Sequence, residues 1–299
     1  MSVNGSSRAA LLALAALSLI WGYNWVVMKK VIQYVDPFDF SAIRAAFGAL
    51  TLFIVLVLLK RPMRLVAGRE VLLLGLLQTG LFTALIQWAL VTGGAGKTAV
   101  LVYTMPFWVI PMAWLTLGER VRGVQWFGVA LAGGGLVLIL EPWSLGGSVF
   151  GNLLAVLAGI TWAASSVLAK HMRHKREFDL LGLTAWQMLF GALALCIFAF
   201  FHTSRPIEPT PYFFGALIFN AVFATGLAWV LWLFVLQRLS AGMAGLSALG
   251  IPMVGVLSGW IELGERPTGS EFAGMGLIVG ALALVSLWGL WQARRSVPG

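Results

Sequence analysis

Ten apolar runs, each about as long as a bilayer is thick, follow one another along the chain with short polar connections between them. A helix needs about 20 predominantly apolar residues to cross the hydrocarbon core. The runs are continuously apolar, whereas the strands of a membrane barrel alternate over about 10 residues, so the pattern predicts helices. The predicted spans are residues 9–28, 40–59, 71–91, 98–117, 123–140, 149–169, 180–201, 212–236, 242–261 and 272–291.

The composition excludes a soluble protein. Of the 299 residues 60% are hydrophobic and only 10% are charged, which is too few polar side chains to cover a soluble surface. Arg8 precedes a stretch rich in Leu and Ala, so a cleaved signal peptide is an alternative for the first run. Because this run has a counterpart later in the chain, we expect it to remain as a membrane span. The sequence therefore predicts an all-α integral membrane protein with ten transmembrane helices.

The distribution of basic residues predicts the orientation in the membrane. There are 20 Lys and Arg against 11 Asp and Glu, a formal net charge of +9. With a cytoplasmic N-terminus, 14 of the 20 basic residues lie in inside segments and 5 in outside segments. The positive-inside rule then places both termini in the cytoplasm. The basic cluster at residues 170–176 is interpreted as a topology determinant rather than a lipid or nucleic-acid patch, so no nucleic-acid partner is expected.

The chain lacks the usual signatures of enzymes and cofactor sites. The single cysteine, Cys196, excludes an intrachain disulfide. The Gly-Lys-Thr at residues 96–98 resembles the end of a phosphate-binding loop, but Val91 stands where that loop needs a glycine. His171 and His174 lie among cations, with no acidic or thiol partner in their loop, which disfavours a metal site. We expect no cofactor, no metal and no catalytic residues.

Two parts of the chain repeat each other. The motif Leu-Gly-Glu-Arg occurs at residues 117–120 and again at residues 263–266, an offset of 146 residues. Pro106 and Pro252 are related by the same offset. Nearer the start, the Ile-Trp-Gly stretch at residues 20–22 aligns with a Thr-Trp-Ala stretch at an offset of 141 residues, the difference being absorbed by loop length. A fused duplication explains these matches.

The duplication divides the chain into a first repeat, residues 1–145, and a second repeat, residues 146–299. Each repeat holds five predicted spans. Because five is odd, the second repeat must enter the membrane from the opposite side, so the two repeats are inverted. Inverted repeats usually bind substrate near the midplane at their interface and exchange conformations by rocking. The sequence therefore predicts alternating access.

The Leu-Gly-Glu-Arg ends of the fourth and ninth spans, the Gly-rich spans that follow them, and the Ile-Trp-Gly stretch at residues 20–22 resemble the EamA family of the drug/metabolite transporter superfamily. The resemblance covers the whole chain in two copies. It implies a ten-helix, exporter-like carrier of the inner membrane, whose partners are a small-molecule substrate and the lipid bilayer. Within the superfamily the chain looks most like exporters of amino acids and related metabolites, including the YddG-type aromatic amino-acid exporters. We expect a monomer, with a homodimer as the alternative.

The positions of the acidic residues bear on energy coupling. All 11 lie in loops or at the ends of predicted spans. Small multidrug pumps of the same superfamily use a glutamate of the first span to exchange protons for cations, and residues 9–28 contain no acid. A buried carboxylate relay has no candidate here. We therefore predict weakly coupled or uncoupled transport, driven by the substrate gradient.

Polar and aromatic residues inside the predicted spans are candidates for a substrate site. Polar side chains left unpaired against lipid are costly, so they must face protein or a wet cavity, and an interhelical hydrogen bond is the alternative role for each. An amino acid needs hydrogen-bond partners for its charged groups and an apolar wall, and aromatic rings can also hold an ammonium group. The candidate substrate-binding residues are Trp21, Asn24, Gln78, Phe82, Tyr103, Trp162 and Ser165.

Arg44 is the only cation within a predicted span. A charge at such a position is functional by default. Three roles remain open: the side chain can extend outward to Asp36 or Asp39, bind a substrate carboxylate, or form a gate ion pair.

Pro106 and Pro252 lie in the middle of equivalent spans. Proline removes a backbone hydrogen bond, so these residues are predicted to bend the helices that gate the pathway, with a passive kink as the alternative. The acid and base of the repeated motif are expected to form ion pairs that fix span ends at opposite membrane faces, with alternate gate closure as a second interpretation. These helix-end residues are Glu119, Arg120, Glu265 and Arg266.

Other functions remain as alternatives. The cargo could be a nucleoside, a sugar or a cationic compound. An integral membrane enzyme is disfavoured because no ionisable groups converge at a membrane interface, and a channel is disfavoured because the repeat and the kinked spans suit a carrier.

Overall fold

The computed structural model describes residues 5–118, 123–140, 149–202, 205–236 and 250–295. Within these ranges every regular element is a helix and there is no strand. The elements are α1 (Gly5–Val31), α2 (Pro37–Leu58), α3 (Gly68–Gly75), η1 (Leu76–Leu81), α4 (Phe82–Thr92), α5 (Ala95–Val102), α6 (Met105–Leu117), α7 (Gly123–Leu140), α8 (Val149–Lys175), α9 (Leu180–Phe201), α10 (Pro211–Ile218), η2 (Phe219–Leu227), α11 (Ala228–Leu236), α13 (Gly250–Leu263) and α14 (Gly269–Arg295).

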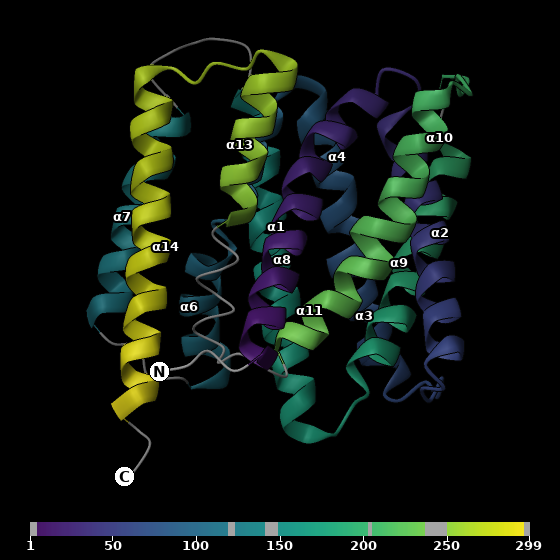
Figure 1. The fold of residues 1–299 in the computed structure, drawn as a ribbon, viewed down its shortest axis with the longest axis horizontal. Coiled ribbons are helices and arrows are strands. Elements are labelled where there is room, and N and C mark those ends of the chain that lie inside the picture. Colours follow the sequence, from purple (N-terminus) through teal and green to yellow (C-terminus); the bar gives the residue numbers. More distant parts are fainter. Residues whose placement is uncertain (1–4, 119–122, 141–148, 203–204, 237–249, 296–299) are drawn as a thin grey trace.

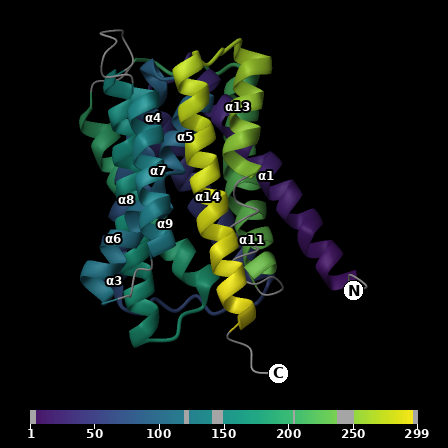
Figure 2. The same ribbon diagram turned by 90° about the vertical axis from the view of Figure 1, so that its left-hand side faces the viewer.

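The helices form one bundle whose two ends are clearly distinguished. The start of α1 and the end of α14 lie at the same end of the bundle, toward the bottom of Figure 1, which we call the terminal face. The connection between α13 and α14 lies at the opposite end, which we call the distal face (Figure 1). Figure 2 shows α14 running along the bundle from one face to the other, whereas α1 crosses the bundle obliquely.

Seven helical stretches are long and apolar enough to cross a membrane: Leu12–Val31, Pro37–Leu58, Gly68–Thr92, Ala95–Leu117, Val149–Arg173, Leu180–Phe201 and Pro211–Trp232. Three shorter apolar helices, Gly123–Ile139, Gly250–Leu263 and Gly269–Val285, coincide with the remaining predicted spans. The predicted ninth span begins at residue 242, and residues 242–249 lie outside the described part of the chain. The described part of the chain is therefore all-helical, as in a multi-pass membrane protein, with seven helices long and apolar enough to span a bilayer and three shorter apolar helices.

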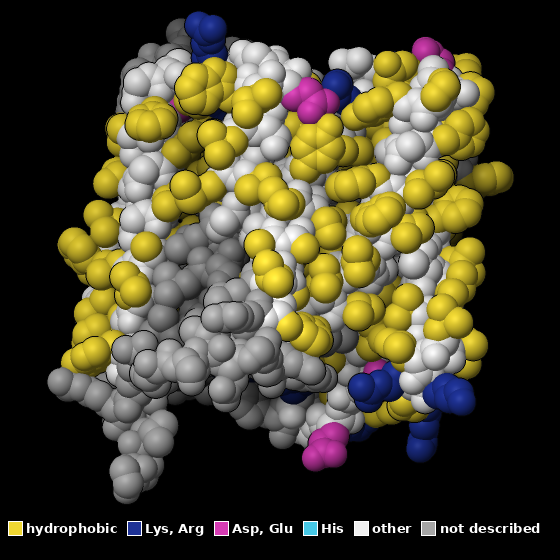
Figure 3. Space-filling view, in the orientation of Figure 1, with side chains coloured by type: hydrophobic (Ala, Val, Ile, Leu, Met, Phe, Trp, Pro, Cys, Tyr) yellow, Lys and Arg dark blue, Asp and Glu magenta, His cyan; other side chains and the backbone are white. Residues whose placement is uncertain are grey.

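The surface has the character expected of a protein in a bilayer. In the space-filling view of Figure 3, hydrophobic side chains cover the middle of the visible face, whereas charged side chains lie toward its upper and lower edges. Many large apolar side chains are exposed to the surroundings, among them Leu115, Phe200 and Ile261 at 75%, 82% and 83%. In water such a surface would aggregate, but in lipid it is solvated.

The repeated Leu-Gly-Glu-Arg motif ends a helix in both repeats. Gly118 follows α6 with a φ of 66°, and Gly264 follows α13 with a φ of 68°. This left-handed backbone conformation is the usual stop after a helix and is strained for residues with a Cβ atom. The glycine of the motif is thus required by the backbone at both places.

Contacts between helices of the two repeats occur in equivalent pairs. α2 packs on α9, and α7 packs on α14, so in each case a helix contacts its own repeat counterpart. α1 packs on α13 and α11 in the same way that α8 packs on α6 and α4. The contact of α2 with η2 is matched by that of α9 with η1. The backbones of α7 and α14 approach so closely that a Cβ atom on Gly135 would lie 2.7 Å from the Gly274 carbonyl oxygen.

Two π-helical segments occupy equivalent places in the third and eighth predicted spans. η1 and η2 each end in the sequence Thr-Gly-Leu, at residues 79–81 and 225–227, which are related by the offset of 146 residues. A π-helical turn widens the helix and leaves backbone groups less regularly paired, and such turns are frequent at functional sites. The sequence did not predict these segments, because their local composition is that of an ordinary apolar helix.

The fourth predicted span is broken in the middle. α5 ends at Val102 and α6 begins at Met105, with Pro106 in its first turn. The Thr104 hydroxyl, between the two helices, donates a hydrogen bond of 2.6 Å to the Leu101 carbonyl oxygen and accepts one of 3.2 Å from the indole nitrogen of Trp108. The regular helix is therefore interrupted for two residues just before the proline.

Candidate functional site

A cavity of about 600 Å³ lies in the middle of the bundle, between the two repeats. Residues of α1, α2, η1, α4, α5 and α6 of the first repeat line it together with residues of α8, α9, η2, α11, α13 and α14 of the second repeat. Its volume falls in the range of small-molecule sites, roughly 300 to 1,000 Å³. The site is therefore large enough for a metabolite and is shared by both halves of the chain.

Most of the residues selected from the sequence line this cavity. The structure brings together Trp21, Asn24, Gln78, Phe82, Tyr103 and Trp162, six of the seven candidates. They come from four separate predicted spans, the first, third, fourth and sixth.

Ser165 is the exception and has to be replaced by its neighbour. Its side chain is fully buried, and its hydroxyl donates a hydrogen bond of 2.8 Å to the Trp162 carbonyl oxygen. Ser166 lines the cavity instead. At 3.6 residues per turn, a residue four positions after Trp162 lies closer to the direction of its side chain than a residue three positions after it.

Trp162 is the centre of an aromatic cluster contributed by α8 and the first repeat. Its ring centroid lies 5.4 Å from that of Phe82 and 5.5 Å from that of Tyr103, the latter in an edge-on arrangement. All three residues line the cavity. Edge-on and tilted pairs at these distances are the favourable geometries for aromatic side chains, so this wall is both apolar and firmly packed.

Trp21, the repeat counterpart of Trp162, is the centre of a second aromatic cluster. Its ring centroid lies 6.0 Å from that of Trp229 and 6.3 Å from that of Trp232, both on α11. Its indole nitrogen donates a hydrogen bond of 2.8 Å to the carbonyl oxygen of Ala224 in η2. The π-helical segment thus supplies the acceptor that holds this indole in place.

The tryptophans of α11 line the cavity and were missed in the sequence. The repeat did not mark them in the sequence, because their counterparts at the offset of 146 residues, Thr83 and Ile86, were not candidates, although all four line the cavity. Their positions three apart place them on one helix face. In a run as apolar as α11, however, a tryptophan that faces a cavity cannot be distinguished from one that faces lipid.

Arg44 reaches the cavity from α2. One terminal guanidinium nitrogen, Nη1, donates a hydrogen bond of 3.2 Å to Oδ1 of Asn220, while the Asn220 amide nitrogen donates to the Ala216 carbonyl oxygen at 3.0 Å. The Nε atom of Arg44 is buried and has no acceptor. Asp36, a proposed outward partner, instead accepts from the backbone N–H of Phe38 at the start of α2. Of the described residues that line the cavity, Arg44 is the only charged one.

A neutral amide occupies the position equivalent to Arg44 in the second repeat. The sequence Phe-Gly-Ala-Leu occurs at residues 47–50 of α2 and 190–193 of α9, and the same offset of 143 residues relates Arg44 to Gln187. Gln187 also lines the cavity, and its Oε1 atom accepts a hydrogen bond of 3.0 Å from the Thr79 hydroxyl of η1. The cavity is therefore asymmetric in charge, although its framework is symmetric.

The two prolines predicted to gate the pathway, Pro106 and Pro252, are related by the repeat offset of 146 residues and both lie in described helices. Pro106 lines the cavity in the first turn of α6. Pro252 is buried near the start of α13 and does not line the cavity. The described part of the chain thus shows the predicted pair at matching places, with only Pro106 in contact with the site.

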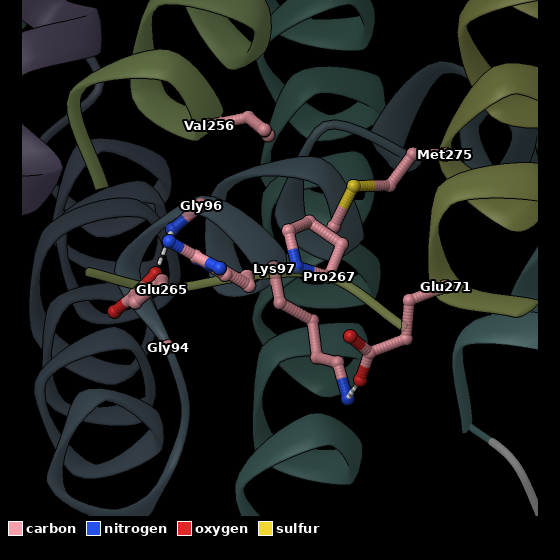
Figure 4. A pocket seen from close by; sticks show the side chains of 9 residues that line it. Gly94, Gly96, Lys97, Val256, Glu265, Pro267, Glu271 and Met275 are labelled. Carbon is pink, nitrogen blue, oxygen red and sulfur yellow. Dashed lines mark hydrogen bonds and ion pairs between the residues drawn. The ribbon is translucent and has the colours of Figure 1, made fainter. Parts of the chain in front are cut away.

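A second, smaller pocket of about 260 Å³ lies at the distal face, where Glu265 and Arg266 are among the lining residues. The Glu265 carboxylate accepts a hydrogen bond of 2.7 Å from the backbone N–H of Ala95. It accepts a second, of 3.1 Å, from the backbone N–H of Gly96 (Figure 4). Lys97 forms an ion pair with Glu271 beside it. Glu265 therefore caps the start of α5, a helix of the other repeat. Glu119 and Arg120, the counterparts in the first repeat, lie outside the described residues.

Further contacts join the two repeats at the distal face. Lys30 at the end of α1 forms an ion pair of 2.6 Å with Glu262 of α13. The backbone N–H of Glu208 donates to the carbonyl oxygen of Tyr34 at 2.8 Å. At the terminal face, the described residues include an ion pair of 3.5 Å between Arg61 and Asp179.

The sequence matches the model of the EamA-like transporter family twice, over residues 8–141 and 149–287. The chain belongs to this family. Each match covers one of the two halves recognised from the repeated motif, and together the matches include all the cavity-lining residues named above.

Proteins with similar sequences carry names that are consistent with this family. The chain is 30% identical to the uncharacterized transporter YoaV of Bacillus subtilis strain 168, over 92% of this chain and 93% of YoaV. It is 26% identical to a probable amino-acid metabolite efflux pump of Escherichia coli strain K12, over 98% and 99% of the two chains. It is 27% identical to the uncharacterized inner membrane transporter YedA of the same strain, over 92% and 90%.

A solved structure supports the fold of this EamA-like protein. It matches with a TM-score of 0.66 at 19% identity, over 94% of this chain and 97% of the other. The protein is thus a membrane transporter of the EamA-like family.

Proposed function

We propose that this protein exports amino acids or related small metabolites across the inner membrane by alternating access. The central cavity carries this proposal, because its two indole-centred aromatic walls, neutral amides and single guanidinium suit a small polar molecule with an apolar side chain. The name of the E. coli relative, a probable amino-acid metabolite efflux pump, points to the same class of cargo.

The proposed mechanism uses two inverted repeats of five spans, residues 1–145 and 146–299. The exchange symmetry of the helix contacts supports it, since two repeats packed in this way can adopt two related conformations by exchanging roles. Rocking of one repeat against the other would expose the cavity first to one side of the membrane and then to the other.

We place the termini in the cytoplasm, so that the distal face is the outer face. The contacts of Glu265 with α5 and of Lys30 with Glu262 favour a conformation closed at that face. Opening outward would require these links between the repeats to separate. The break at Pro106 and the π-helical segments lie along the cavity and are the proposed points of bending.

Transport is proposed to be weakly coupled to protons or uncoupled from them. The described lining of the cavity contains no carboxylate that could carry a proton between the two faces. An outwardly directed substrate gradient then supplies the driving force.

Counterflow in proteoliposomes tests the proposed function. Vesicles loaded with unlabelled L-phenylalanine should accumulate the labelled amino acid transiently and saturably, whereas protein-free vesicles and vesicles with Trp162→Ala should not. Flux that does not saturate would point to a channel.

A panel with a nucleoside, a sugar and a quaternary ammonium compound decides the cargo. If the protein exchanges one of these compounds and no amino acid, the amino-acid assignment is rejected. A steep dependence on an imposed proton gradient would reject uncoupled transport.

A further inference from the structure

The charge of the cavity narrows the class of substrate beyond the proposed export of small metabolites, on which this inference rests. We infer that Arg44 binds the carboxylate, or an equivalent anionic group, of the transported molecule, and that cationic compounds without such a group are excluded.

The guanidinium of Arg44 is incompletely satisfied within the protein. An arginine side chain carries five N–H donors and a full positive charge. Nη1 has a neutral acceptor, the Asn220 amide oxygen, whereas Nε is buried without any acceptor. A buried charge is costly unless it is paired and hydrogen-bonded. A carboxylate in the cavity would supply both the missing countercharge and the missing acceptors, and the planar guanidinium is suited to carboxylate geometry.

The hydrogen bonds around Asn220 hold its amide in the orientation that the guanidinium needs. Its nitrogen donates to the Ala216 carbonyl oxygen one helical turn earlier, which directs Oδ1 toward Arg44. Asn220 is 1% exposed, so this arrangement is protected from competing water. Arg44 is therefore held at the cavity wall by η2 and does not extend to the membrane surface.

The other polar groups of the cavity can accept the remaining part of a zwitterion. Asn24 lines the cavity, is 7% exposed, and its Oδ1 atom is a buried acceptor without a donor. An ammonium group supplies such a donor, and the faces of Trp21 and Trp162 can add cation–π attraction. A cation without a carboxylate would instead meet an uncompensated guanidinium in a site of low dielectric constant.

The difference in charge between equivalent positions of the two repeats orients a bound substrate within the cavity. Gln187, at the position equivalent to Arg44, is neutral and already accepts from Thr79. The anionic end is therefore drawn to the side of the cavity formed by α2 and η2. Arg44→Gln makes the two repeats alike at this position and removes the charge without introducing a side chain foreign to the site.

Binding measurements on the purified protein with matched ligands test this inference. L-phenylalanine carries both charged groups, L-phenylalaninamide lacks the carboxylate, and 3-phenylpropionate lacks the ammonium. Wild-type protein should prefer L-phenylalanine to its amide, and Arg44→Gln should weaken L-phenylalanine and 3-phenylpropionate binding on the order of 10- to 100-fold while leaving the weaker amide binding nearly unchanged. Arg44→Lys should lie between the two. Arg64→Gln, in the exposed connection between α2 and α3, is the control for loss of a positive charge elsewhere.

The outcomes separate the inference from the proposed function. Retained binding of the amide by Arg44→Gln shows that the variant is folded. Equal losses for all three ligands, or unchanged L-phenylalanine binding, would overturn the anchoring role while amino-acid export stands. Binding of 3-phenylpropionate that depends on Arg44, without binding of any amino acid, would uphold the carboxylate site and reject amino acids as cargo. If wild-type protein binds only compounds without an anionic group, the inference is wrong.

Discussion

The carboxylate of Glu265, just beyond the end of α13, accepts a hydrogen bond of 2.7 Å from the backbone N–H of Ala95, the first residue of α5. Through this bond, the repeated Leu-Gly-Glu-Arg motif of the second repeat satisfies a helix start of the first. The first N–H groups of a helix have no partner within the helix and carry a partial positive charge, so a carboxylate is a favourable acceptor there. The motif at residues 263–266 therefore ends α13 and caps the start of α5.

We predict that Glu265→Ala lowers the stability of the purified protein, measured by its thermal unfolding midpoint, by an amount corresponding to roughly 1 to 2 kcal/mol. Glu262→Ala, three residues earlier, removes the part-exposed ion pair with Lys30 and the hydrogen bond with the Tyr23 side chain, and it should cost less than about 1 kcal/mol. Equal effects of the two substitutions would show that the cap on α5 has no special weight.

The placement of Ser165 and Ser166 can be distinguished by thiol labelling. In a Cys196→Ser background, the Ser166→Cys variant should react with a small water-soluble thiol reagent, because residue 166 lines the cavity. The Ser165→Cys variant should be unreactive, because residue 165 is fully buried. A transported amino acid should slow the labelling at position 166. The reverse order of reactivity would contradict the orientation of α8.

Gln87 is predicted to be replaceable with a gain in stability. Its side chain is fully buried in α4, and neither its Nε2 nor its Oε1 atom has a hydrogen-bond partner. Gln87→Met keeps the size of the side chain and removes the unsatisfied amide, which should raise stability by about 1 to 3 kcal/mol. Gln187→Met is the control, since it removes the acceptor of the Thr79 hydroxyl and should lower the unfolding midpoint. A fall with Gln87→Met would indicate that its amide is hydrogen-bonded to an internal water molecule.

Pro106→Ala is predicted to slow exchange more than it disturbs folding. Alanine can supply the N–H and helical geometry that proline denies, so α5 and α6 should tend to join into one stiffer helix along the cavity. Counterflow should slow severalfold while the unfolding midpoint stays the same or rises. Pro111→Ala, inside α6, is the control and should leave the exchange rate near that of the wild type. Equal rates for wild type and Pro106→Ala would remove the bending role.

Membrane character and the approximate limits of the helices could be predicted from the residues alone. Hydropathy over about 20 residues is a local property, and a bilayer imposes one length on every span. The same holds for the motif matches at residues 117–120 and 263–266, on which the predicted division into two repeats rests. The helix ends within the membrane were not predictable in this way, because η1, η2 and the break after Val102 lie inside long, predominantly apolar runs whose hydropathy does not mark them.

The composition of the candidate site depended on packing. The neighbours Ser165 and Ser166 have the same chemistry, and only the rotation of α8 against its neighbours decides which one reaches the cavity. Arg44 had outward and inward roles open to it until the contact between α2 and η2 placed Asn220 beside its guanidinium. The sequence by itself therefore determines the membrane character, the approximate helix limits and the internal repeat, because these depend on local hydropathy and on repeated motifs. Only the packing of the helices decides which distant side chains meet in the cavity. Arg44 and Asn220, for example, are 176 residues apart in the chain and are brought together by contacts between segments that local sequence patterns do not relate.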